Sequence, residues 1–168
     1  MFPRSATVAW LATALSLASP SSTVAATAAP PPVALTDDSA WQIVQGCVAH
    51  ARAKGQSEAI AVYDEGGHPI VVFRMNGNAP GITEFAMQKA EAVAYWRFST
   101  EQMVDAARET PGFANAPHVV LVAGGVPVFT EQGQFVGAVG VSGEAPSDDA
   151  ACAEAGILAA QFATTRRK

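Results

Sequence analysis

The stretch that decides the fold runs from residue 124 to residue 143. It reads Gly124-Gly125-Val126-Pro127-Val128 and then, after a polar turn at 131–134, Val136-Gly137-Ala138-Val139-Gly140-Val141-Ser142-Gly143. Two apolar runs around such a turn predict a β-hairpin. Glycines inside the second run weaken a strand, because they have high backbone entropy and no side chain to pack. We therefore expect this strand to lie against another backbone, in a neighbouring helix or a second copy of the chain, rather than to bind phosphate.

The rest of the chain carries helix and strand patterns in turn. Apolar residues at helical spacing, and a capping box at Ser99 and Gln102, predict four helices, at 39–54, 82–97, 99–108 and 148–165. Alternating or continuous apolar runs predict five strands, at 59–63, 70–75, 118–123, 126–130 and 135–142. Hairpin connections between strands predict an α/β (α+β) domain with a five-stranded, mostly antiparallel sheet and helices packed on it.

The N-terminal segment has the pattern of a secretory signal peptide, which we assign to residues 1–28. Arg4 precedes an apolar run at 8–17, and small residues follow it. That run is too short to span a bilayer. Residues 29–36 form a Pro/Ala-rich linker, and 37–168 form one domain. The expected location is periplasmic or secreted, with no membrane span after signal cleavage.

The charge balance excludes one class of partner. The chain has 10 Lys and Arg against 15 Asp and Glu, for a net charge of −5. Nucleic acid demands a basic surface, so we expect no nucleic-acid partner. The one basic cluster, at 166–168, is expected to complement the dipole at the end of the last helix.

The two cysteines, Cys47 and Cys152, fall on the first and last predicted helices. In an oxidising compartment they can form one disulfide if those helices pack side by side. The alternative is two buried free thiols, which we favour at this point. Two cysteines alone do not make a structural zinc site.

Two cationic residues are candidates for binding an anion. Lys89 falls within the apolar stripe of its helix, so it must snorkel, pair with a carboxylate or meet a ligand anion. Arg74 closes a strand and can fork onto a carboxylate or phosphate. It can equally be a solvated strand residue or a partner for Asp64.

Three histidines, His50, His68 and His118, are candidate ligands for a metal or for haem iron. No pair of them has metal-ligand spacing. No Cys-x-x-Cys-His site is present, which excludes covalent c-type haem.

Four blocks of the sequence resemble the GlcG/HbpS family, which also occurs as the C-terminal domain of PduO-type proteins. They are Ala61-Val62-Tyr63-Asp64-Glu65-Gly66-Gly67-His68-Pro69-Ile70, Arg74-Met75-Asn76-Gly77, Lys89-Ala90, and the glycine-rich segment 124–143 with the helix after it. The sequence departs from the family pattern at Asn76, Ala92 and Ser99. The resemblance implies a three-layer α/β domain that forms a homo-oligomer.

The resemblance also implies a function. Some members bind haem, including secreted ones that sense or sequester it, so a non-covalent haem is the first expectation, with a membrane sensor or haem-uptake protein as partner. One or two of His50, His68 and His118 would then ligate iron, and Lys89 and Arg74 would hold the propionates.

Two alternatives stay open. One is an accessory protein or enzyme that acts on a small hydroxy or oxo acid. Lys89 and Arg74 would hold the carboxylate of that acid, and Asp64 would act as base. The other is an oligomeric interaction domain without a ligand.

Overall fold

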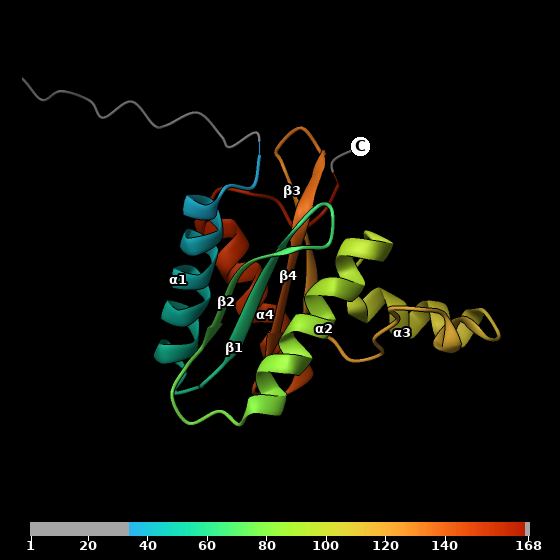
Figure 1. The fold of residues 1–168 in the computed structure, drawn as a ribbon, viewed down its shortest axis with the longest axis horizontal. Coiled ribbons are helices and arrows are strands. Elements are labelled where there is room, and N and C mark those ends of the chain that lie inside the picture. The colour runs from blue at the N-terminus through green and yellow to red at the C-terminus, as the bar shows by residue number, and fades with distance from the viewer. Residues whose placement is uncertain (1–33, 167–168) are drawn as a thin grey trace, which may run out of the picture.

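The computed structural model describes residues 34–166, so the expected signal peptide and most of the expected linker lie outside the described residues. Figure 1 shows the arrangement of the elements. The helices are α1 (Asp37–Ala53), α2 (Pro80–Trp96), α3 (Thr100–Glu109) and α4 (Pro146–Ala159), with a short 3₁₀ turn at Phe113–Asn115. The strands are β1 (Ala59–Asp64), β2 (Pro69–Arg74), β3 (Gly125–Phe129) and β4 (Phe135–Ser142).

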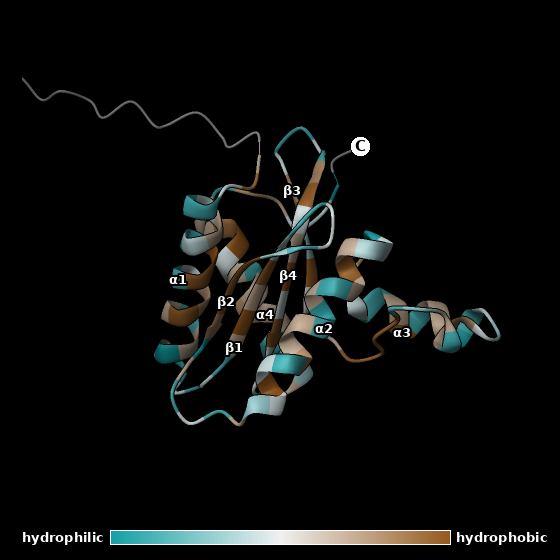
Figure 2. Ribbon diagram, in the orientation of Figure 1, coloured by the Kyte–Doolittle hydropathy of each residue, from teal (hydrophilic) through white to brown (hydrophobic). Residues whose placement is uncertain are grey.

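The fold has three layers, with the sheet in the middle and helices on both of its faces. Its strands lie in the order β2-β1-β4-β3, and every neighbouring pair is antiparallel. Helices α1 and α4 cover one face and α2 covers the other (Figure 1). Figure 2 shows hydrophobic residues along the strands and the helices packed on them. One buried cluster lies between the sheet and α1 and α4, and a smaller one lies between the sheet and α2. This confirms an α+β fold with helices packed on an antiparallel sheet.

The expected fifth strand, at 118–123, is absent from the described part of the chain, and the expectation of five strands is wrong. On the outer edge of β3, an isolated bridge joins Phe129 to Ala163, whose N–H and carbonyl each bond to Phe129 at 2.8 Å. Residue 118 also adopts a left-handed backbone, with φ 58°, which strands do not contain. The apolar run 118–123 is therefore a partly buried loop.

Gly140 of β4 lies where α2 approaches the strand closely. A Cβ added at Gly140 would meet the backbone of Ala86 and Ala90, at positions no real side chain occupies. Both alanines are fully buried, and α2 packs directly onto β4. Of the two explanations expected for this strand, packing against a neighbouring helix is therefore present.

The last helix ends earlier than expected, at Ala159 rather than near residue 165. Gln161 takes a left-handed backbone with φ 63°, and Phe162 turns inward until only 3% of it is exposed. Residues 160–166 then run along the β3 edge. Arg166 therefore does not sit at a helix end, and its expected role beside the helix dipole is wrong.

A disulfide joins Cys47 of α1 to Cys152 of α4, so the preference for free thiols is wrong. The two helices pack side by side over one face of the sheet, with 4.7 Å between the two Cα atoms. Spacing in the sequence could not reveal this, because the residues are 105 positions apart.

The capping box predicted for α3 is present. The Ser99 hydroxyl accepts from the Gln102 N–H at 3.1 Å, and the Gln102 side chain accepts from the Ser99 N–H at 2.9 Å. Helix α3 and the loop after it project away from the sheet (Figure 1). Within residues 34–166, no helix is both long enough and apolar enough to cross a membrane.

Candidate functional site

Lys89 is fully buried and already paired. It extends from α2 toward the end of β4. Its Nζ donates to Asp149 Oδ2 of α4 at 2.7 Å and to the Val141 carbonyl of β4 at 2.8 Å. The ring of Phe85 lies 4.8 Å from the same ammonium. A buried charge needs such partners, because removing an unpaired ion from water costs on the order of several kcal/mol. Of the three roles expected for Lys89, pairing with a carboxylate is the one that the structure contains.

Gly124 lies directly over this ammonium. Its φ is 121°, and a Cβ there would come within 2.7 Å of Lys89 Nζ and 2.9 Å of Asp149 Cβ. Only glycine fits this backbone conformation and this space. The glycine-rich segment thus closes over the Lys89–Asp149 ion pair and separates it from the surface.

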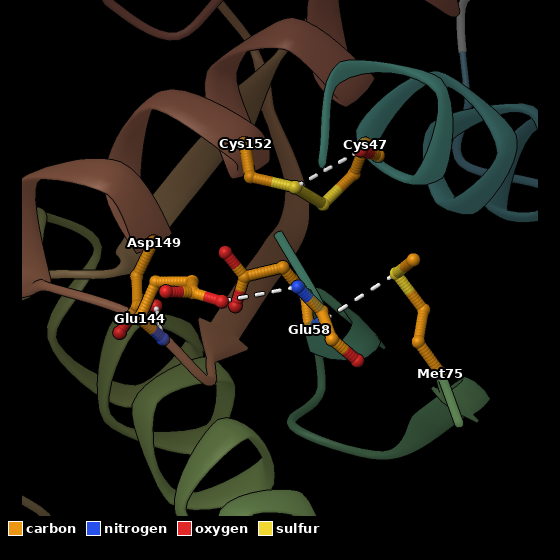
Figure 3. The surroundings of a disulfide bond; sticks show 7 residues. Cys47, Glu58, Met75, Glu144, Asp149 and Cys152 are labelled. Atoms are coloured by element: carbon orange, nitrogen blue, oxygen red, sulfur yellow. Dashed lines mark hydrogen bonds between the residues drawn. A yellow bond between two sulfur atoms is a disulfide. The ribbon is translucent and has the colours of Figure 1, made fainter. Parts of the chain in front are cut away.

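A second buried acid, Glu58, lies beside that pair. Figure 3 shows it below the disulfide, between Met75 on one side and Glu144 and Asp149 on the other. It is fully buried, and neither carboxyl oxygen has a hydrogen-bond partner among the described residues. Burial, followed by the negative charge of Asp149, raises the pKa of Glu58 to about 8. Glu58 therefore carries a proton at neutral pH.

The two other expected anion-binding residues lie at opposite ends of one hairpin. Arg74 pairs in register with Ala59 at the start of β1, whereas Asp64 ends β1. Six residues of strand separate the two by roughly 16 Å. Arg74 donates to the carbonyl of Asn78. The structure thus does not bring Lys89, Arg74 and Asp64 together around one small acid.

Asp64 is occupied by its own turn. Its Oδ1 accepts from the backbone N–H groups of Gly66 and His68, both at 2.9 Å. These bonds, that of His68 first, hold the pKa of Asp64 below its usual range. A carboxylate of lowered pKa is a weak base, so its chemistry here is that of a turn cap.

The three histidines lie in different environments. His50, near the end of α1, has a buried Nε2 with no hydrogen-bond partner among the described residues. His68 lies in the β1–β2 turn with 79% of its side chain exposed and its Nδ1 3.4 Å from Asp64. His118 lies in the loop before β3 and is partly covered, with 38% exposed.

His118 is the histidine most firmly held by its neighbours. Its ring stacks on Tyr95 of α2, with centroids 4.0 Å apart and planes 5° apart. Its Nδ1 lies 3.5 Å from Glu91 Oε1 on the same helix. The indole of Trp96 donates to the carbonyl of Pro117 at 3.0 Å and so fixes the backbone just before it. A non-glycine residue at φ 58° costs about 1 kcal/mol or more, which these contacts offset.

The same surface gathers a second histidine and a buried tyrosine. The Tyr95 ring lies against Gly67, the neighbour of His68, as well as against His118. Burial and the charge of Glu91 raise the pKa of Tyr63. We call Glu91, Tyr95 and His118, with the buried Tyr63 behind them, the histidine–tyrosine surface.

This surface contains one imidazole, that of His118, with a carboxylate near its Nδ1. With the Glu91 carboxylate 3.5 Å from Nδ1, Nε2 is the nitrogen of His118 that remains to donate a lone pair to a metal. The Tyr95 ring, 57% exposed, covers one face of this imidazole. Among residues 34–166, no group of three or more His, Cys, Asp or Glu side chains could hold a bare metal ion.

Sequence reasoning missed Glu58, Glu91 and Tyr95. The one available signal for Glu58 was an acidic residue directly before an otherwise apolar strand, at Ser57-Glu58-Ala59-Ile60. Glu91 and Tyr95 lie on the outward side of an amphipathic helix, where polar residues are expected and carry no special signal.

Comparison with known proteins assigns the chain to a family. Residues 35–158 match the family model described as haem degrading protein HbpS-like. Protein GlcG of Escherichia coli K12 is 37% identical over 113 residues, which cover 66% of this chain and 82% of GlcG.

Solved structures share the fold. A double mutant of HbpS from Streptomyces reticuli superposes with a TM-score of 0.69 and 25% identity, over 87% of this chain and 97% of that one. A PduOC:heme complex superposes with a TM-score of 0.73 over 80% of this chain and all of that one, at 23% identity, which shows the fold alone. The matched family model spans most of the described domain, and the chain belongs to the HbpS-like family.

Proposed function

We propose that this protein binds haem non-covalently and that His118 ligates the iron. The observation that carries the proposal is the His118 ring itself, stacked on Tyr95 and held at Nδ1 by Glu91. Family membership and the fold shared with a haem complex support it. Of the three histidines, His50 has its Nε2 buried and His68 is held only at a turn.

The residues present supply the axial donor that haem needs. His118 offers the imidazole, the Tyr95 ring stacked on it limits how that ring can turn, and the Glu91 carboxylate lies 3.5 Å from its Nδ1. The haem supplies the iron and its redox chemistry, and this chain supplies the ligand, its orientation and its surroundings.

A hemin titration tests the proposal. We expect a shifted Soret band that saturates at one haem per chain at micromolar protein. His118→Ala should abolish the shift, and Glu91→Gln should weaken binding by about 10- to 100-fold, the usual effect of removing the carboxylate behind a ligating histidine.

His68→Ala and His50→Ala are the matched controls, since each removes one imidazole outside the Glu91–His118 pair. Both should bind hemin as the parent chain does. A flat titration of the parent, or a full Soret shift in His118→Ala, would refute the proposal.

We also infer that the protein is exported to the periplasm or secreted. The signal-like pattern at 1–28 supports this, and so does the buried disulfide, because such bonds persist in oxidising compartments. N-terminal sequencing of protein purified from the producing cells should begin near residue 29. A start at Met1 with both cysteines reduced would contradict export. The homo-oligomer stays a prediction, which light scattering would test.

A further inference from the structure

A groove at the far end of α2 carries two arginines that the proposed haem site does not use. It lies between Arg97, the residue after α2, and Arg166, in the tail after α4, and it has a volume of about 500 Å³. Phe98, Pro127 and Phe129 supply its apolar lining. This volume falls within the range of small-molecule sites, which is about 300–1,000 Å³.

Each guanidinium rests on a buried aromatic ring. Arg97 Cζ lies 5.3 Å from the centroid of Phe135, and Arg166 Cζ lies 5.9 Å from that of Phe129. The two rings touch edge to face, 5.8 Å apart, and each is only 5% exposed. Stacking occupies the flat face of a guanidinium and leaves its in-plane N–H groups free to donate.

Neither arginine has an acidic partner among the described residues. The ion pairs there are formed by other cations, although the chain as a whole carries a net charge of −5. Two positive charges that line one groove repel each other unless an anion lies between them. The groove is therefore lined by two exposed guanidinium groups that have no acidic partner in the described part of the chain.

The backbone at Arg97 supports a role for its side chain. Arg97 takes the left-handed conformation at the end of α2, with φ 62°, a position that glycine usually occupies. An arginine there costs free energy, and its guanidinium lies over Phe135 at the groove.

We propose that this groove binds an organic carboxylate with a flat apolar body. The carboxylate lies between the guanidinium groups of Arg97 and Arg166, which match its geometry as two-pronged donors. The apolar body lies against Phe98 and Pro127. Gln102 and Thr165 on the rim add polar groups for further substituents. This binding site is independent of the proposed haem ligand, because His118 is not part of its lining.

The test uses naphthalene-2-carboxylate as the probe, added to the haem-free full chain and followed by calorimetry. We expect saturable one-to-one binding that weakens as salt is raised. Arg97→Gln and Arg166→Gln should each weaken it by about tenfold or more, the effect of one charge-assisted contact. The matched amine, 2-naphthylmethylamine, should not bind.

Arg97→Gly keeps the test clear of folding effects. Glycine favours the backbone conformation at this position, so this variant should unfold at the same temperature as the parent or higher while still losing affinity. The matched control is Arg108→Gln, because Arg108 is an exposed arginine that lines a different cavity and pairs with Asp105. It should bind the probe as the parent does.

Three results would overturn the proposal. They are the absence of saturable binding to the parent, equal binding of the amine, and unchanged affinity in both Arg97→Gly and Arg166→Gln. Failure of the hemin titration would leave these measurements untouched, because the two sites use different probes and different residues.

Discussion

At the scale of single residues, the charged groups behind β4 form one coupled network. Lys89 neutralises Asp149, whose other oxygen accepts from the Glu144 N–H at 3.0 Å. Glu58 lies in contact with the same group of acids and is held in its protonated form by burial. One cation and one proton thus balance two buried carboxyl groups in the interior.

The first prediction concerns the buried ion pair. Asp149→Asn leaves Lys89 buried without a counter-charge, so we expect a loss of about 3–5 kcal/mol in the free energy of unfolding. Urea unfolding measures it. Asp148→Asn is the matched control, since Asp148 is the next residue and its pair with Lys54 is exposed to solvent. A small effect of Asp149→Asn, equal to that of the control, would contradict a stabilising pair.

The second prediction concerns pH. Because the pKa of Glu58 rises from 4.5 to about 8 on folding, the native state holds this proton where the unfolded state has lost it. Stability contributed by this group is therefore complete below about pH 4.5 and is lost as the pH rises through 8.

Urea unfolding between pH 5 and pH 9 would follow this loss. We expect the parent chain to lose a few kcal/mol, about 1.4 kcal/mol for each unit of pKa shift. Glu58→Gln, which imitates the protonated acid, should show a flatter profile. Equal slopes for the two proteins would show that Glu58 does not titrate in this way.

At the scale of elements, the contact between α2 and β4 positions both candidate sites. It brings Lys89 to Asp149 at one level of the helix, Glu91 and Tyr95 to His118 further along, and Arg97 to the groove at its end. The helix can lie so close because β4 has no side chain at residue 140.

The third prediction tests that close approach. Gly140→Ala places a methyl group against the backbone of Ala86, so we expect a loss of about 1–3 kcal/mol in thermal or urea unfolding. Gly81→Ala, in the first turn of α2, has open space around it and should be neutral or slightly stabilising. If both substitutions had the same effect, helix packing would not explain the bare strand.

Local pattern predicted most of the elements, and pairing decided the exceptions. The capping box at Ser99 and the alternation in 135–142 were read correctly from neighbouring residues alone. The run 118–123 has the composition of a strand, but its first residue takes a left-handed backbone and the run is a loop. Whether a run of strand composition joins a sheet depends on contacts distant in the sequence.

At the scale of the whole molecule, the disulfide closes the chain on itself. It joins the first helix to the last across 105 residues, on the face of the sheet opposite α2. The tail beyond α4 then returns to the edge of β3, where it brings Arg166 within reach of the groove.

The fourth prediction concerns this cross-link. A disulfide across so long a loop restricts the unfolded chain, so the Cys47→Ala/Cys152→Ala variant should lose about 2–5 kcal/mol in the free energy of unfolding. Dithiothreitol should destabilise the parent by a comparable amount and leave the double variant unchanged. A parent chain insensitive to reductant would argue against the bond.

Periodicity, capping and turn chemistry within short windows predicted the α+β class and the type and order of nearly every element. The family came from the resemblance of four motif blocks. The sequence also pointed to Lys89 as unusual and to His50, His68 and His118 as equal candidates for an iron ligand. Only the tertiary structure decided the partners of Lys89 and His118, which are Asp149 and Glu91, together with the disulfide, the protonated Glu58 and the paired arginines of the groove. Charge, burial and pairing are properties of neighbours in space, and those neighbours come from elements far apart along the chain.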